Sequence, residues 1–336
     1  MQTIYVPILK CKQGEEKALS HLDSNIKSVI KPLLEIPYSV TSKKHSLCGH
    51  LQSFWSDYPF FFYFMPEWQN KSQEPYSTFI SDKVLPIINQ LPGTPVINLS
   101  STEYIKNWKP LSKNGIAIRL RNNEFSEIAS LLNPLFNSGM IEVSQTDLIF
   151  DLQHISSDRL DDITSLLDTT FSNLPNAHEY HSIIVASASF PKNTYTLDYS
   201  KIYQFNRIED KIHNHLLNLS NQYGFHYLFS DYGTSDMEDY KYIPGIFPNF
   251  KIKYTSWENY LYIKGHSITK GGLDIHNVRH LAKLLVSSPD FSGPEFSWGD
   301  NIIYQIAEAL TLSPGNLMNW ISYNMNHHIT LIAKEL

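Results

Sequence analysis

Residues 115–125 read GIAIRLRNNEF, and the alternation within this segment decides how the chain is interpreted. In an extended strand the isoleucines and the leucine lie on one face, whereas Ala117, Arg119 and Arg121 lie on the other. The apolar face predicts a strand packed into a core. The two arginines must then face something that can accommodate positive charge.

Short apolar runs that end in polar residues recur along the chain. They are TIYVPILK (3–10), VIKPLLEI (29–36), FFFYFMPE (60–67), TPVINLS (94–100), GIAIRLR (115–121), TDLIFDLQ (146–153), SIIVASAS (182–189) and FHYLFSDYG (225–233). Segments with apolar residues at helical spacing separate them, such as SEIASLLNPLF. Strands that alternate with helices predict βαβ units and parallel pairing.

Eight such runs predict a TIM-like α/β fold, a closed (β/α)8 barrel. An open doubly wound sheet is the alternative. No GxGxxG pattern follows the first run, which disfavours the dinucleotide-binding version of that sheet. The third run is the least clear, because its aromatic residues could belong to a buried insertion.

The alternation of apolar runs and helical segments stops after residue 234. This change predicts a barrel over 1–245 and an extension over 246–336 packed on it. Residues 251–265 predict a β-hairpin. Asp274 and Asp300 are placed to begin two helices, and a last helix carries His327 and His328. Adjacent helical residues point about 100° apart, so this histidine pair is expected to pack on the barrel rather than share a metal ion.

Composition limits the class of protein. A net charge of −6 argues against a general nucleic-acid coat, although a local basic pocket is compatible with it. Two cysteines cannot build a disulfide framework and do not form a zinc pattern, so both are interpreted as reduced thiols in a cytoplasmic protein. No signal-peptide pattern and no segment long enough to span a membrane is recognised in the sequence.

Active sites of (β/α)8 barrels lie at the carboxyl ends of the strands, so the polar ends of the runs are the candidate site. These residues are Lys10, Glu35, Glu67, Asn98, Ser100, Arg119, Arg121, Asp151, Gln153, Ser187, Ser189, Asp231 and Tyr232. Charged groups that share a confined mouth need partners, which makes their convergence informative. Each residue alone could instead cap a helix or serve a structural ion pair, for example Arg119 with Glu35 or Asp151.

The residue types suggest two roles. Glu35, Asp151 and Asp231 are predicted as catalytic acids or bases. Ligand binding is assigned to Lys10, Arg119, Arg121, Gln153, Ser187 and Tyr232. Arginine and lysine side chains can hold a phosphate or carboxylate through charge-assisted hydrogen bonds. No metal site is predicted and no cofactor is identified, although the carboxylates are ligands of the type that Mg²⁺ takes.

The order of several segments resembles the beta protein family of phages, prophages and bacterial genomes. The segments are YVPILKCKQGEEKAL, KPLLEIP, the RLR strand, LIFDLQ, SASFP, SDYG, SWGDNII and NHHIT, between residues 3 and 330. The resemblance implies a setting, phage–host or inter-phage conflict, because the family takes its name from a gene beside a toxic gene in a phage-exclusion cassette. It implies no catalytic residue.

Three functions follow as hypotheses. The first is a phage-defence component whose barrel mouth binds an anionic, phosphate- or nucleotide-like ligand, with phosphoester hydrolysis as a variant. The second is a non-enzymatic partner or neutraliser of a neighbouring toxin or antiphage effector, acting through the aromatic hairpin (Tyr254, Trp257, Tyr260 and Tyr262). The third, nucleic-acid binding, is disfavoured by the acidic balance. Under the first hypothesis, Arg119→Ala abolishes binding and leaves thermal stability nearly unchanged, whereas a large loss of stability identifies a structural ion pair.

Overall fold

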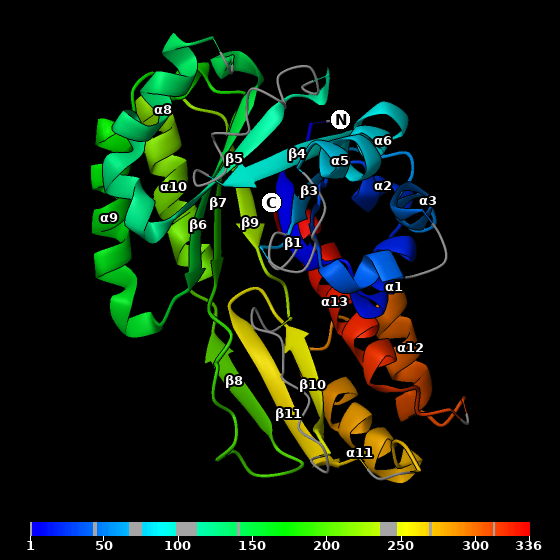
Figure 1. Ribbon diagram of the computed structural model, residues 1–336. Coiled ribbons are helices and arrows are strands. Elements are labelled where there is room, and N and C mark those ends of the chain that lie inside the picture. The colour runs from blue at the N-terminus through cyan, green and yellow to red at the C-terminus, as the bar shows by residue number, and fades with distance from the viewer. Residues whose placement is uncertain are drawn as a thin grey trace.

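The computed structural model describes residues 2–42, 46–66, 76–98, 113–139, 142–235, 247–268, 271–311 and 313–336. Eight parallel strands close into a barrel, which confirms the predicted fold class (Figure 1). Every predicted run supplies one strand, including the aromatic third run. In barrel order the strands are β1 (Tyr5–Lys10), β2 (Leu33–Ile36), β3 (Phe60–Phe64), β4 (Gly93–Asn98), β5 (Ile116–Arg121), β6 (Thr146–His154), β7 (Ser182–Ala188) and β9 (Tyr227–Asp231).

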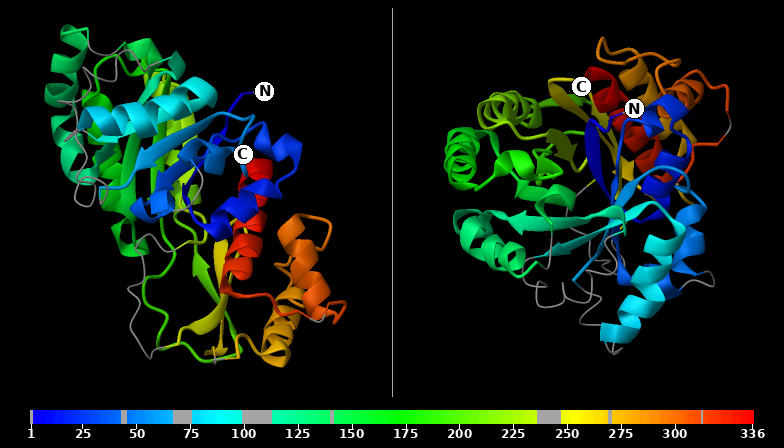
Figure 2. Two further views of the ribbon diagram at one scale, coloured as in Figure 1. Left: turned by 45° about the vertical axis from the view of Figure 1, so that its right-hand side comes forward. Right: turned by 90° about the horizontal axis from the view of Figure 1, so that it is seen from above.

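Helices surround the strands, as the view from above in Figure 2 shows. The α-helices are α1 (Gln13–Ser20), α2 (Ser24–Lys27), α3 (Leu47–Gln52), α5 (Tyr76–Phe79), α6 (Leu85–Gln90), α8 (Ile128–Asn137), α9 (Leu160–Asn173) and α10 (Glu209–Tyr223). Shorter 3₁₀ or π-helical turns are η1 (Tyr38–Ser42), η2 (Ile80–Val84), η5 (Asn122–Glu127), η6 (Val143–Gln145), η7 (Ser157–Arg159) and η8 (Ala177–Glu179). The apolar faces of these helices and the outward faces of the strands form the largest hydrophobic core.

A three-stranded antiparallel sheet extends from the barrel. Its strands are β10 (Asn249–Thr255), β11 (Asn259–Ser267) and β8 (Ile202–Asn206), in the order β10-β11-β8. The predicted hairpin is therefore confirmed, and β8 is a third strand that the sequence interpretation missed. Helices α11 (Ile275–Val286), α12 (Trp298–Ala307) and α13 (Leu317–Glu335) pack on this sheet around a second core.

Two helix starts can be compared with their predictions. Asp274 caps α11, because its side chain accepts a hydrogen bond from the backbone N–H of His276. The start assigned to Asp300 is wrong by one turn: Ser297 is the N-cap of α12 and accepts from the backbone N–H of Asp300. Asp300 is instead a buried residue of the first helical turn.

The C-terminal helix α13 returns to the barrel and contacts both α1 and β1 (Figure 1). It thereby covers the junction where β9 pairs with β1 and closes the barrel. His327 and His328 are both buried, and His328 packs on the barrel, as predicted, through Asp231 of β9. His327 instead contacts Asp300 of α12 and Thr255 of β10. None of the helices in the described ranges combines the length and the apolar character that crossing a bilayer requires.

Candidate functional site

Arg119 lies at the centre of a buried charge network inside the barrel. Its Nε and Nη2 donate to Asp151 Oδ2 at 3.0 and 2.8 Å, and its Nη1 donates to Glu35 Oε1 at 2.8 Å. The side chain is 1% exposed. Because β5 alternates, Arg119 points inward beside Ala117, which belongs to the apolar interior of the barrel. The predicted convergence of Arg119, Asp151 and Glu35 is therefore seen in the structure.

Two tyrosines complete the surroundings of this guanidinium. Arg119 Nη2 also donates to Tyr232 Oη at 2.7 Å, and Tyr232 Oη donates to Asp151 Oδ1 at 2.8 Å. The ring of Tyr63 lies 5.0 Å from the guanidinium carbon. Burial, together with Asp151 and Glu35, raises the pKa of Tyr232 well above its ordinary value, although Arg119 opposes this. The phenol is thus a neutral hydrogen-bond donor that helps to hold Asp151.

Opposite charges keep Arg119 protonated. Burial alone would lower its pKa, but Tyr232, Asp151 and Glu35 raise the pKa above its ordinary value. Four N–H donations from this one side chain reach protein oxygens. Arg119 therefore acts as an internal strut, the structural pairing that the sequence left open for it.

Arg121 occupies the next inward position of β5, towards the carboxyl end. Its side chain is 35% exposed, and its Nη1 lies 3.7 Å from Asp151 Oδ2. The long contact to a carboxylate that Arg119 already engages leaves most of its hydrogen-bonding capacity facing outward. Arg121 is thus the more exposed of the two arginines on this strand.

Gln153, which was predicted as a ligand-binding residue, has a structural role through its backbone. A register irregularity between Asp151 and Gln153 interrupts the pairing of β6 with β7, and Gln153 has a φ of 59°. In this left-handed conformation its backbone N–H donates to Asp151 Oδ1 at 3.0 Å. Non-glycine residues take such a conformation at an energetic cost and often near functional sites. The bulge fixes the carboxylate through the backbone.

Lys10 brings a further positive charge to this end of the barrel. It is buried and pairs in register with Glu35 across β1 and β2. Lys10 alternates with Val6 and Ile8, which belong to the barrel interior, so its side chain starts inward. Three cations (Lys10, Arg119 and Arg121) and two carboxylates (Glu35 and Asp151) give this mouth network a formal charge of +1.

Asp231 does not join the mouth network, and its predicted place there is wrong. Asp231 is the last residue of β9, and Tyr232, which follows it, belongs to the barrel interior. The strand alternation therefore turns Asp231 to the outer face. There its Oδ2 lies 2.9 Å from His328 Nε2 on α13, and its Oδ1 accepts from Tyr5 Oη at 2.6 Å. Although burial alone would raise it, His328, Arg207 and Tyr5 hold the pKa of Asp231 below its usual value.

Ser187 is likewise misplaced by the sequence interpretation. Its neighbours Ala186 and Ala188 belong to the barrel interior, so Ser187 faces the surrounding layer. Glu35, Asp151 and Asp231 therefore do not converge as ligands of one Mg²⁺ ion, since two are bound to Arg119 and the third lies behind the wall. Glu67 and Ser100, also considered for the mouth, lie outside the described residues.

Of the four aromatic residues predicted to form an exposed interface on the hairpin, three are buried and Trp257 is half-buried. Tyr254, Tyr260 and Tyr262 are all buried. Tyr254 stacks on His327 and donates to Asp300 Oδ1 at 2.8 Å, while Tyr260 donates to Glu209 Oε1 at 3.0 Å. The packing of α13 and the barrel against the small sheet uses these rings as core.

Tyr63 is the mouth residue that sequence reasoning missed. It lies in the aromatic third run and accepts a hydrogen bond from Asn98 Nδ2 at 2.7 Å. Its signal was the alternation with Phe61, which places both side chains inside the barrel.

The family model described as Beta protein matches residues 5–334, nearly the whole chain. The search of curated proteins found no match to this chain.

Proposed function

The chain belongs to the beta protein family, and we propose that the mouth of its barrel binds an anionic, phosphate- or nucleotide-like ligand. The main support is that two arginines of one strand, Arg119 and Arg121, have different surroundings. Arg119 is saturated by internal oxygens, whereas Arg121, next along the inward face, keeps a 35% exposed guanidinium. Ligands of (β/α)8 barrels bind at this end of the strands.

The surroundings of Arg121 favour an anion. The mouth network carries a formal charge of +1, and a guanidinium binds phosphate or carboxylate oxygens through paired hydrogen bonds. Asp151 would otherwise draw Arg121 inward, but Arg119, Tyr232 and the Gln153 backbone already engage both oxygens of that carboxylate. Within the described residues, the ion pair with which the ligand would compete is the 3.7 Å contact between Arg121 and Asp151.

Binding is better supported than hydrolysis. A general base needs a carboxylate within reach of a proton to be removed. Asp151 and Glu35 instead accept hydrogen bonds from Arg119, and Asp231 lies on the outer face of the barrel wall. We assign the mouth a recognition role and keep phosphoester hydrolysis as the lesser alternative.

The biological setting is proposed from the family alone. Its phage-exclusion context supports a role in antiphage defence, in which the ligand would report infection or regulate a neighbouring effector. A non-enzymatic partner or neutraliser of a toxic effector is the competing role. With the three hairpin tyrosines buried, Trp257 is the one predicted hairpin aromatic that such a partner could reach.

Calorimetric titration of the full chain with inorganic phosphate and with nucleoside triphosphates tests the proposal. Loss of charge-assisted hydrogen bonds worth about 1.5–3 kcal/mol should weaken binding roughly 10- to 100-fold in Arg121→Ala. Arg159→Ala is the matched control, because Arg159 is an exposed arginine paired only with Asp162 in the described structure. Equal affinities in wild type and Arg121→Ala would refute the site. No binding at all, with co-purification of a neighbouring gene product, would favour the partner role.

A further inference from the structure

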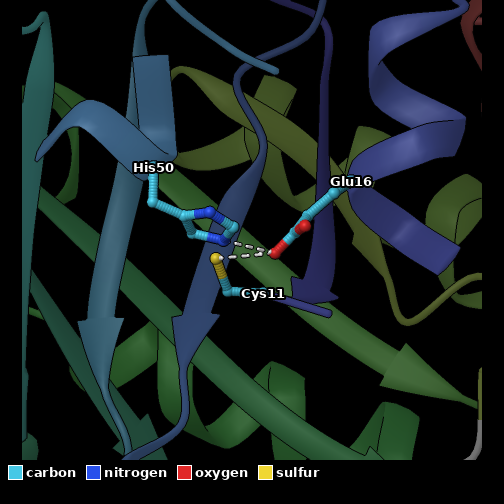
Figure 3. Close-up of side chains that lie close together, drawn as sticks. All are labelled: Cys11, Glu16 and His50. Atoms are coloured by element: carbon cyan, nitrogen blue, oxygen red, sulfur yellow. Dashed lines mark hydrogen bonds and ion pairs between the residues drawn. The ribbon is translucent and has the colours of Figure 1, made fainter. Parts of the chain in front are cut away.

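Cys11, Glu16 and His50 bring three metal-binding side chains together outside the mouth network (Figure 3). His50 Nε2 lies 2.8 Å from Glu16 Oε1, and the Cys11 thiol donates to the same oxygen at 3.6 Å. The three ligand atoms all lie within 4.8 Å of one another. In the described part of the chain this is the one group of at least three such residues that could hold an ion.

Three separate elements fix the group. Cys11 follows β1 directly, and its backbone N–H donates to Glu35 O at 2.8 Å. Glu16 lies on α1, and His50 lies on α3, which Ser46 caps by accepting from the Gly49 N–H. The three side chains thus come from the end of a strand and from two helices.

The burial of the group suits an ion with one open position. Cys11 is part of the hydrophobic core between strands and helices. The side chains of His50 and Glu16 are 17% and 12% exposed, so the group reaches solvent on one side. A bound ion would have protein ligands on its inner side and water on its outer side.

Donor chemistry selects the ion. Thiolate, imidazole and carboxylate are all zinc ligands, whereas Mg²⁺ prefers oxygen ligands alone. A thiolate and a carboxylate also balance the charge of Zn²⁺.

Two of the three distances between ligand atoms can be compared with zinc geometry. Tetrahedral bonds of about 2.0–2.3 Å place zinc ligand atoms about 3.3–3.5 Å apart. The 3.6 Å sulfur–oxygen distance meets this value. The 2.8 Å nitrogen–oxygen distance would open by about 0.5 Å.

We propose that Cys11, Glu16 and His50 bind one Zn²⁺ ion, with water in the fourth position. On binding, the Cys11 thiol releases its proton to solvent, and the proton of the His50–Glu16 hydrogen bond is transferred through solvent to His50 Nδ1. His50 Nε2 and Glu16 Oε1 then each bond to the metal, with the imidazole neutral. The ion would tie α1 and α3 to the end of β1. This inference does not rest on the proposed anion site, which uses other side chains.

Metal titration of the full chain, purified and treated with chelator, tests the inference. We expect one Zn²⁺ per chain and, with Co²⁺ as probe, a thiolate-to-cobalt charge-transfer absorption in the near ultraviolet. Loss of supporting partners around a metal weakens binding roughly 10- to 100-fold, so Cys11→Ser or His50→Ala should cost more than about 100-fold. Metal should also raise the thermal midpoint of wild type and not of Cys11→Ser.

The chain offers matched controls. Cys48 is the other buried cysteine and contacts Pro86 O and Gln90, so Cys48→Ser should retain the affinity and the cobalt absorption. His215 lies 2.8 Å from Asp168 in a comparable histidine–carboxylate pair, so His215→Ala should bind Zn²⁺ normally. Substoichiometric binding, equal affinity in Cys11→Ser and Cys48→Ser, or a cobalt spectrum without the thiolate band would overturn the proposal and leave the group a structural ion pair.

Discussion

Replacing Arg119 by methionine tests whether this residue is an internal strut. The substitution keeps most of the apolar stem but strands Asp151 and Glu35, whose carboxylates both accept hydrogen bonds from the guanidinium. Removing one partner of a buried ion pair costs about 3–5 kcal/mol, because the remaining charge is left uncompensated. We therefore expect a loss of about 4 kcal/mol in the free energy of unfolding.

The loss can be expressed as a thermal shift. An unfolding entropy of about 2.1 cal/mol/K per residue over 336 residues gives about 0.7 kcal/mol/K for cooperative unfolding. A loss of about 4 kcal/mol then lowers the midpoint by about 6 °C. Scanning calorimetry or circular dichroism at neutral pH measures this shift directly.

Two further variants sharpen the result. Arg121→Met removes the neighbouring, more exposed arginine and should cost no more than about 1 kcal/mol. Adding Asp151→Asn to Arg119→Met removes one stranded charge and should recover part of the lost stability, which a double-mutant cycle measures. A midpoint for Arg119→Met within about 2 °C of that for Arg121→Met would refute the strut assignment and restore Arg119 as a candidate ligand residue.

Three other substitutions test the contact of Asp231 with α13, the close approach of α12 and α13, and the left-handed turn after α12. Because the pKa of Asp231 is depressed in the folded protein, its ionised form stabilises the fold above about pH 4, and this stability is lost as the pH falls through the folded pKa. The difference in urea midpoint between wild type and Asp231→Asn should therefore shrink on acidification. A constant difference would contradict the assignment. A Cβ at Gly299 would lie 2.1 Å from Tyr323 O, so Gly299→Ala should push α12 away from α13. Urea unfolding should then show a loss of about 1–3 kcal/mol in the free energy of unfolding. A variant as stable as wild type would show that the two helices do not pack this closely. Ala309 has a φ of 60°, so Ala309→Gly should raise stability by about 1 kcal/mol, and a decrease would argue against the left-handed turn.

The barrel could be predicted because its signal is local and repeated. Each strand is a short apolar run, and successive runs are separated by helical spacing. The edge strand β8, by contrast, has the sequence IYQFN and is half-exposed, so it lacks the apolar run by which the barrel strands were recognised. Its partner β11 lies more than fifty residues later, a pairing that local patterns do not encode. The return of α13 to the barrel is equally non-local.

The prediction of the candidate site was correct for residues that were assigned to a face by strand alternation. Arg119 and Asp151 were both expected inside, and they meet there. Asp231 and Tyr232 were also both placed inside, although adjacent residues of a strand face opposite sides. If Tyr232 faces the interior, Asp231 must face the outer side, where it contacts His328 of α13. The Cys11–Glu16–His50 group was missed because it joins three elements across a long sequence separation.

A crystal structure of the full chain with inorganic phosphate or a nucleoside triphosphate would show where the anion binds. We expect the anion on the guanidinium of Arg121 at the mouth, with Arg119 still bonded to Asp151 and Glu35, and no anion there in crystals of Arg121→Ala grown in the same solution. An anion bound elsewhere, or an Arg119 side chain on the outer wall of the barrel, would contradict this expectation.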